Sequence, residues 1–191
     1  MYKRQLKDGF KKIENYDNKI IFGHSIGALV AVHGILNNVI NPDYLILTAP
    51  TFQVNYPEFL KKLAKPLSSL APNLRSFSNV TKNNLTNDKD VVKNYFNDPL
   101  VFRSITFRAG YEIIKAQDYV NSNIKNLNIE TLVLHGENDT ISPIQGSLEL
   151  SKLENVKYIK VENSKHEILN QDTRMYALSE IHEWLKIKGL V

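Results

Sequence analysis

The sequence predicts an α/β fold in which helices cover both faces of a parallel sheet. Four short apolar segments have the length and composition of buried strands, at residues 19–23, 44–48, 131–135 and 156–161. Helical patterns separate or follow these segments. Strands that alternate with helices form parallel sheets with both faces covered, so we expect a single layered α/β domain.

The first half of the expected domain begins with a helix. Residues 4–15 are predicted to form an amphipathic surface helix, because apolar side chains recur there at helical spacing on a charged background. The strand at 19–23 then runs directly into a segment, residues 25–36, that is apolar nearly all round. Such a segment is typical of a helix packed against a sheet.

Between the second and third strands, residues 51–124 have little strand character. Three stretches of this segment suit helices, at residues 59–70, 90–96 and 104–120. We therefore expect a helical cap insertion at about 51–124, over the carboxyl ends of the strands, where open α/β sheets bind ligands. Two more helices are predicted after the third and fourth strands, at about 143–153 and 171–188.

Composition excludes several classes of function. The chain carries 24 Lys and Arg against 20 Asp and Glu, spread along its length, so its charge does not favour nucleic acid as a partner. It has no cysteine, which excludes disulfides, thiolate metal sites and a cysteine nucleophile. Neither paired metal-binding histidines nor a phosphate or dinucleotide glycine pattern is found, so we expect no metal and no cofactor. Residues 1–19 are polar and no run approaches about 18 apolar residues, so we expect a cytoplasmic protein without a transmembrane segment.

The strongest chemical signal is the segment Gly23-His24-Ser25-Ile26-Gly27, which has the pattern Gly-x-Ser-x-Gly. A buried strand runs into it and an apolar helix runs out, which predicts a nucleophile elbow with Ser25 as the nucleophile and Gly23, His24 and Gly27 around it. So tight a turn requires small residues two positions before and after the serine. The backbone N–H of Ile26 is the expected oxyanion-hole donor, at a helix N-terminus that favours negative charge. The alternative is that Ser25 only caps the helix.

A serine nucleophile needs a base and a group that orients the base. Asp139, in the polar loop after the strand at 131–135, is the predicted acid, with Glu137 as its rival. His166 follows the fourth strand and is the predicted general base. The other histidines are weaker candidates because they lie at strand ends or inside helical patterns: His24, His33, His135 and His182.

Several separated motifs carry a family resemblance. Segments 23–27, 132–143 and 164–170 are similar to those of the monoacylglycerol lipase and lysophospholipase group of α/β-hydrolases, also described as serine aminopeptidase-like. Segments 85–88 and 97–101 resemble marks of that group's cap. The resemblance implies the α/β-hydrolase fold, an acyl-enzyme mechanism and hydrolysis of carboxylic esters, with a small-molecule ester or lipid such as a monoacylglycerol or lysophospholipid as substrate.

The same resemblance implies that a front part of the domain is missing. In the family four strands precede the nucleophile strand, and one leads into a His-Gly loop that supplies the second oxyanion-hole amide. Only 19 residues precede Ile20 here. We therefore expect residues 1–191 to form an N-terminally truncated α/β-hydrolase domain with a partial parallel sheet of about four C-terminal strands. The nucleophile strand would be an open edge, through which two chains could pair.

Three functions remain open at this point. The first is a serine esterase; the second is an acyltransferase or peptidase with the same triad; the third is a non-catalytic remnant or fragment. The predicted helix at 59–70 is apolar on one face and carries Lys61, Lys62 and Lys65 on the other. This pattern suits a lid that touches lipid surfaces, and equally an ordinary amphipathic helix with a solvated charged face.

Overall fold

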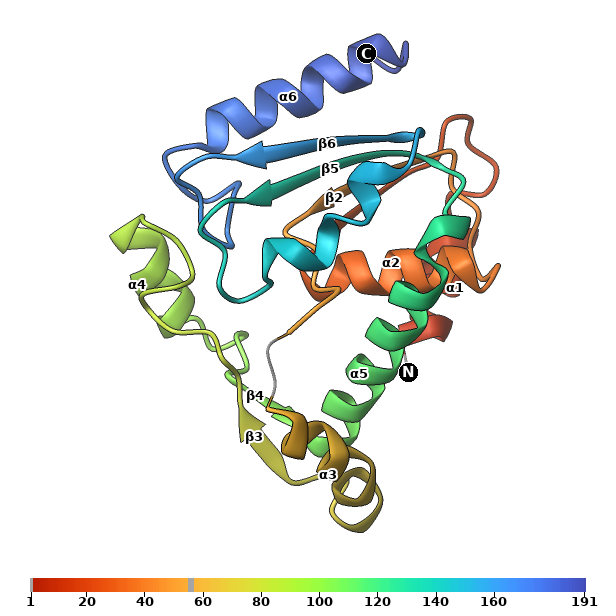
Figure 1. The fold of residues 1–191 in the computed structure, drawn as a ribbon. Helices are drawn as coiled ribbons and strands as arrows, with labels where there is room; N and C mark the ends of the chain where they lie inside the picture. Colours follow the sequence, from red (N-terminus) through yellow and green to blue (C-terminus); the bar gives the residue numbers. More distant parts are fainter. Residues whose placement is uncertain (1, 55–56) are drawn as a thin grey trace.

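The computed structural model describes residues 2–54 and 57–191 and is built around a four-stranded parallel sheet (Figure 1). Residues 55 and 56 of the predicted cap, and Met1, lie outside the described part. The strands are β1 (Ile20–His24), β2 (Tyr44–Thr48), β5 (Glu130–Gly136) and β6 (Val156–Val161), in the spatial order β1-β2-β5-β6. The prediction of four parallel strands is confirmed, with each strand within one or two residues of its expected position.

Helices cover both faces of the sheet, as the apolar composition of the strands requires. The covering helices are α1 (Tyr2–Lys11), α2 (Ile26–Leu36), α5 (Phe107–Asn123) and α6 (Arg174–Ile187). Leu45 and Leu47 of β2 lie in one apolar core with α2 and α5, whereas Ile46 lies in a second core with α6. Figure 1 shows α6 on one side of the sheet and α1 and α2 on the other. Successive residues of a strand point to opposite faces, so one strand supplies both cores.

Two of the predicted helices differ from the structure. The first is α1, which begins at Tyr2 and ends at Lys11 instead of spanning 4–15. The prediction of a helix at 143–153 is wrong, because this segment forms the short 3₁₀ helices η2 (Ile144–Ser147) and η3 (Leu150–Lys152). Oγ of Ser147 lies 2.7 Å from Nδ1 of the buried His135, so this segment is tied to β5 by a contact that its helical pattern does not reveal.

The segment between β2 and β5, which we call the cap segment, contains a two-stranded sheet as well as helices. Its elements before α5 are α3 (Glu58–Leu70), β3 (Arg75–Phe77), α4 (Lys89–Asn97) and β4 (Ser104–Thr106). Helices α3 and α4 lie within one residue of their predicted bounds, but β3 and β4, which pair antiparallel, were not expected. The pairing of β4 delays the start of α5 to Phe107, where Thr106 caps it by accepting the N–H of Ala109. In Figure 1, α3, β3 and β4 extend away from the sheet on the side opposite α6, and α5 leads back to it.

Strand β1 lies at one edge of the described sheet. The N–H of Ser25 donates to the carbonyl of Thr48 in β2 at 3.0 Å. Peptide groups alternate in direction along a parallel strand. The backbone N–H and C=O groups of the even-numbered residues of β1 therefore point away from β2. Phe22, in the middle of β1, is 48% exposed. The edge position of this strand is therefore as expected, and pairing of two chains through it stays a prediction.

Candidate active site

The turn after β1 holds Ser25 in a strained backbone conformation, with φ 53° and ψ −121°. Residues with side chains rarely adopt this region, and such strain is concentrated at functional sites. A Cβ on Gly23 would lie 2.8 Å from the Cα of Ala28, so the strand can pass this close to α2 only with glycine. A Cβ on Gly27 would meet no atom within 4 Å outside its own helix, so the described residues show no contact that requires glycine there, and the need for a small residue at this position stays a prediction. Gly27 is exposed at the start of α2, beside the edge strand.

The side chain of Ser25 points to a histidine and not back to its own helix. Within the described residues it makes no capping hydrogen bond to α2, which removes the capping alternative. Its Oγ lies 2.9 Å from Nε2 of His166. Ile26 is the first residue of α2, so its N–H has no acceptor inside the helix and lies at the positive end of the helix dipole.

The residues predicted as nucleophile, base and acid are brought together by the loops after β1, β6 and β5. Nδ1 of His166 lies 2.8 Å from Oδ2 of Asp139, and Nε2 lies 2.9 Å from Oγ of Ser25. An ionised carboxylate only accepts hydrogen bonds, so Nδ1 carries the proton and Nε2 of the neutral ring accepts from the Ser25 hydroxyl. This is the arrangement in which the imidazole can remove the serine proton.

Asp139 is buried, with 6% of its surface exposed, yet it is held in its ionised form. Burial alone would raise its pKa, but hydrogen bonds from His135 and His166 outweigh burial and lower the pKa to about 2. The backbone N–H groups of Ile141 and Ser142 add two bonds of 2.9 Å to Oδ1. The carboxylate is therefore fixed in position and charged at neutral pH.

The rival acid, Glu137, lies on the surface and does not reach the histidine. Its Oε1 accepts a hydrogen bond from Nζ of Lys160 at 2.7 Å, and this bond lowers the pKa of Glu137 below its usual value. The structure thus places Asp139, and not Glu137, beside His166.

Two of the other histidines flank the site. His24 lies against His166, with ring centroids 5.1 Å apart, and its Nε2 is 3.3 Å from Oε1 of Glu167. His135 is fully buried, and its Nε2 lies 2.8 Å from the carbonyl oxygen of Ser142 and 3.3 Å from Oδ2 of Asp139, so its N–H is shared between these two acceptors. His33 and His182 lie in α2 and α6. No group of three or more His, Asp or Glu side chains placed to hold a metal ion occurs within residues 2–54 and 57–191.

Because of the carboxyl groups of Asp139 and Glu167, the free energy of unfolding depends on pH in the acid range. The hydrogen bond from His24 is the main cause that lowers the pKa of Glu167, also to about 2. An unfolded carboxyl titrates near about pH 4, so both groups stabilise the native state above that pH and lose this contribution as the pH falls toward their folded pKa. We expect the free energy of unfolding, measured with urea, to decrease from about pH 5 to 2.

In Glu167→Gln this decrease should be shallower than in the wild-type chain. The matched control is Glu14→Gln, which removes the same charge from an exposed residue. If the free energy of unfolding decreased equally with pH in Glu167→Gln and in the wild-type chain, Glu167 would not contribute to the decrease.

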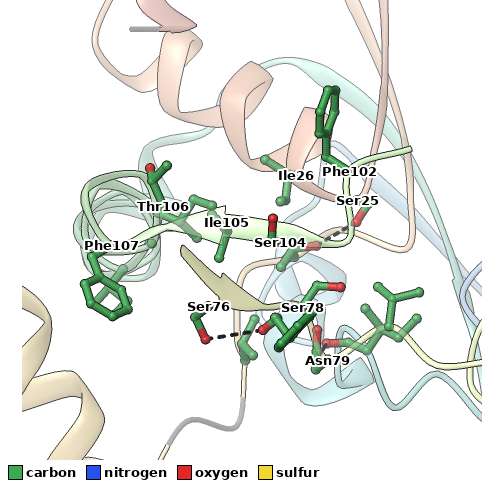
Figure 2. A pocket seen from close by; sticks show the side chains of 18 of the residues that line it. Ser25, Ile26, Ser76, Ser78, Asn79, Phe102, Ser104, Ile105, Thr106 and Phe107 are labelled. Atoms are coloured by element: carbon green, nitrogen blue, oxygen red, sulfur yellow. Dashed lines mark hydrogen bonds between the residues drawn. The ribbon is translucent and has the colours of Figure 1, made fainter. Parts of the chain in front are cut away.

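A cavity of about 720 Å³ opens beside Ser25 and reaches under the cap segment. This size lies within the range of small-molecule sites. Its walls are mainly apolar side chains, with hydroxyls from the cap strands among them: Leu60, Leu67, Ile114, Ser76, Ser104 and Thr106. Figure 2 shows Ser104 of β4 near Ser25, with Ser76 of β3 farther from it; all three residues line the cavity. Ser25 and His166 line the same cavity.

Two hydroxyl groups beside Ser25 were missed by reasoning from the sequence. Oγ1 of Thr51 lies 3.0 Å from Oγ of Ser25, and Oγ of Ser142 lies 2.7 Å from Oγ1 of Thr51. Thr51 follows the carboxyl end of β2, the strand next to β1. Thr51 could have been identified by this position, because polar residues just beyond the carboxyl end of a strand next to the nucleophile strand lie close to the nucleophile.

The chain resembles known proteins in its sequence. The profile of the family described as serine aminopeptidase, S33, matches residues 4–173. A monoglyceride lipase homolog of monkeypox virus is 28% identical over 172 residues, covering 86% of this chain and 62% of that protein. The chain thus spans about three fifths of the length of this relative.

Two solved structures have the same fold. The monoacylglycerol lipase of Paleococcus ferrophilus superposes with a TM-score of 0.86 at 25% identity, covering 96% of this chain and 74% of that one. A soluble variant of monoglyceride lipase from Saccharomyces cerevisiae, in complex with a substrate analog, superposes with a TM-score of 0.79 at 16% identity, covering 96% and 67%. The fold is that of the α/β-hydrolases, and the chain belongs to the serine aminopeptidase S33 family.

Proposed function

We propose that the protein is a serine hydrolase of the monoacylglycerol lipase type, which cleaves carboxylic esters through an acyl-enzyme on Ser25. The observation that carries this proposal is the continuous hydrogen-bonded series from Ser25 through His166 to Asp139 at the wall of an apolar cavity. The names of the matched proteins of monkeypox virus and Paleococcus ferrophilus support a monoacylglycerol as the substrate. A series this complete favours an enzyme over a non-catalytic remnant.

The geometry supports a two-step reaction. His166 takes the Ser25 proton on Nε2 while Oγ attacks the ester carbonyl carbon, and Asp139 stabilises the resulting imidazolium. The N–H of Ile26 donates to the oxyanion of the tetrahedral intermediate. His166 then gives the proton to the departing alcohol, which leaves an acyl group on Ser25. In the second step His166 activates a water molecule, the acid product departs and Ser25 regains its proton.

A substrate panel tests the proposed reaction. The panel contains a short-chain nitrophenyl ester, a monoacylglycerol, a lysophospholipid and an aminoacyl amide. We expect hydrolysis of the esters, with the monoacylglycerol preferred because its acyl chain fills the apolar cavity. Activity confined to the amide would reject the esterase in favour of a peptidase. Transfer of the acyl group to an added alcohol without release of acid would favour an acyltransferase.

Helix α3 has apolar side chains on two sides, which supports a second part of the proposal: the cap touches a lipid surface. Leu60, Ala64 and Leu67 line the cavity, whereas Phe59 (61% exposed) and Leu63 (46% exposed) do not and lie one turn apart. Other cap residues also expose large apolar side chains: Leu70, Leu74, Phe77 and Phe102. In the part of the chain that the structure describes, no helix is long and apolar enough to cross a membrane, so we propose a peripheral contact.

Removing these exposed side chains should weaken binding to lipid. We expect Phe59→Ser and Leu63→Ser each to lower partitioning onto vesicles of phosphatidylcholine and phosphatidylglycerol about tenfold, because each removes an apolar group that would leave water. Co-sedimentation with the vesicles measures this partitioning. Leu148→Ser is the matched control, since Leu148 is 41% exposed and lies outside the cap segment. An equal loss in this control, or no binding of the wild-type chain, would contradict the proposed contact.

A further inference from the structure

The Ser25 hydroxyl has two neighbours, and only one of them belongs to the proposed triad. Nε2 of His166 lies 2.9 Å from Oγ of Ser25, and Oγ1 of Thr51 lies 3.0 Å from it. Thr51 is also bonded to Ser142, whose Oγ is 2.7 Å from its Oγ1. Three hydroxyls therefore form a chain that ends at the histidine.

The direction of every bond in this chain follows from the carboxylate of Asp139. The carboxylate accepts from Nδ1 of His166, so Nε2 accepts from the hydroxyl of Ser25. A hydroxyl has one proton, so Oγ of Ser25 can only accept from Thr51. By the same count, Thr51 accepts from Ser142. Thr51 is thus a hydrogen-bond donor aimed at the atom that attacks the substrate.

Thr51 is held rigidly in this position. Its backbone N–H donates to the carbonyl of Ser25 at 3.3 Å, and its carbonyl accepts from Nε2 of Gln117 at 3.0 Å. Only 5% of its surface is exposed, and Gln117 and Ser142 are buried as well. The donor is therefore in place before the reaction begins, which is the condition under which a dipole stabilises developing charge most effectively.

We propose that Thr51 is a further catalytic residue, whose hydroxyl stabilises the negative charge that develops on Oγ of Ser25. This proposal rests on the proposed function, because it requires Ser25 to be the nucleophile. As the Ser25 proton moves to Nε2 of His166, Oγ becomes a stronger acceptor and the bond from Thr51 strengthens. Thr51 keeps its own proton throughout. When Oγ leaves the acyl carbon in the second step, it carries charge again and accepts from Thr51 again.

Three substitutions separate a catalytic from a structural role. Thr51→Val removes the hydroxyl at nearly constant shape, and we expect kcat/KM for a nitrophenyl ester to fall about 10- to 100-fold, as for loss of one hydrogen bond to a charged oxygen. Thr51→Ser keeps the donor and should recover most of this loss. Ser142→Ala leaves the bond from Thr51 to Ser25 intact and should lower the rate less than Thr51→Val does.

The double substitution Thr51→Val with Ser142→Ala gives the sharpest contrast. Thr51→Val leaves the Ser142 hydroxyl buried without its acceptor, which lowers the unfolding temperature. Removing that hydroxyl as well should restore the unfolding temperature while the rate stays as low as in Thr51→Val. A double variant that recovers rate and stability together would overturn the proposal and make Thr51 structural.

Labelling with a fluorophosphonate probe distinguishes failure of this proposal from failure of the proposed function. We expect the wild-type chain to be labelled and Thr51→Val to be labelled about 10- to 100-fold more slowly. Equal labelling rates would overturn the role of Thr51 and leave Ser25 as the nucleophile. A folded wild-type chain that takes no label would overturn both.

Discussion

Replacement of Ser25 by alanine is expected to lower kcat for ester hydrolysis by about 10,000- to 1,000,000-fold. The substitution removes the proposed attacking atom, and the neighbouring His166 then has no serine proton to take. Because alanine has the same backbone requirements as serine, the strained turn and the packing of α2 should be retained. The measurement is release of nitrophenol from a short-chain ester at saturating substrate, together with urea unfolding of both proteins.

A matched control for this substitution is Ser179→Ala, which removes a hydroxyl from an exposed residue of α6. We expect its activity to equal that of the wild-type chain. If Ser25→Ala is folded and keeps more than a small fraction of wild-type activity, another group performs the reaction and the proposed mechanism is wrong.

Replacement of Asp139 by asparagine is expected to lower kcat by about 10,000-fold with little change in overall structure. The side-chain amide can donate to Nδ1 of His166, which the carboxylate cannot do. The histidine would then carry its proton on Nε2 and could no longer accept from Ser25. The loss of charge also removes the group that stabilises the imidazolium.

The rival residue supplies the control for this second prediction. Glu137→Gln removes the same charge from a surface carboxyl paired with Lys160, and its activity should stay near that of the wild-type chain. A large loss of activity in Glu137→Gln, combined with a small loss in Asp139→Asn, would show that Glu137 and not Asp139 is the acid that orients His166.

Much of the sheet could be predicted from the sequence because its strands are buried on both faces. β2 and β5 are nearly continuous apolar runs bounded by polar residues, and such runs are typical of strands in a parallel sheet with both faces covered. The strands β3 and β4 were missed because they have three residues each and no apolar alternation. The 3₁₀ helices η2 and η3 were missed because a helical pattern alone does not reveal the contact between Ser147 and His135 of β5.

The candidate site was predictable only where a local motif marks it. Ser25 has a turn with a recognisable glycine, and Asp139 and His166 lie directly beyond strands whose carboxyl ends meet at one edge. Thr51 and Ser142 also lie beyond strands, but no local motif distinguishes them from other polar loop residues, and they meet across 91 positions of the chain. Their contact depends on β2 lying between β1 and β5, which is a property of the sheet order and not of any short segment.

Mass spectrometry of the fluorophosphonate-treated chain tests the central claim most directly. A folded protein, checked by circular dichroism, is incubated with the probe and digested, and the modified peptide is sequenced. We predict one adduct, on the peptide that contains Ser25, and none in Ser25→Ala. A folded wild-type chain without an adduct, or with its adduct on another residue, would contradict the claim that Ser25 is an activated nucleophile.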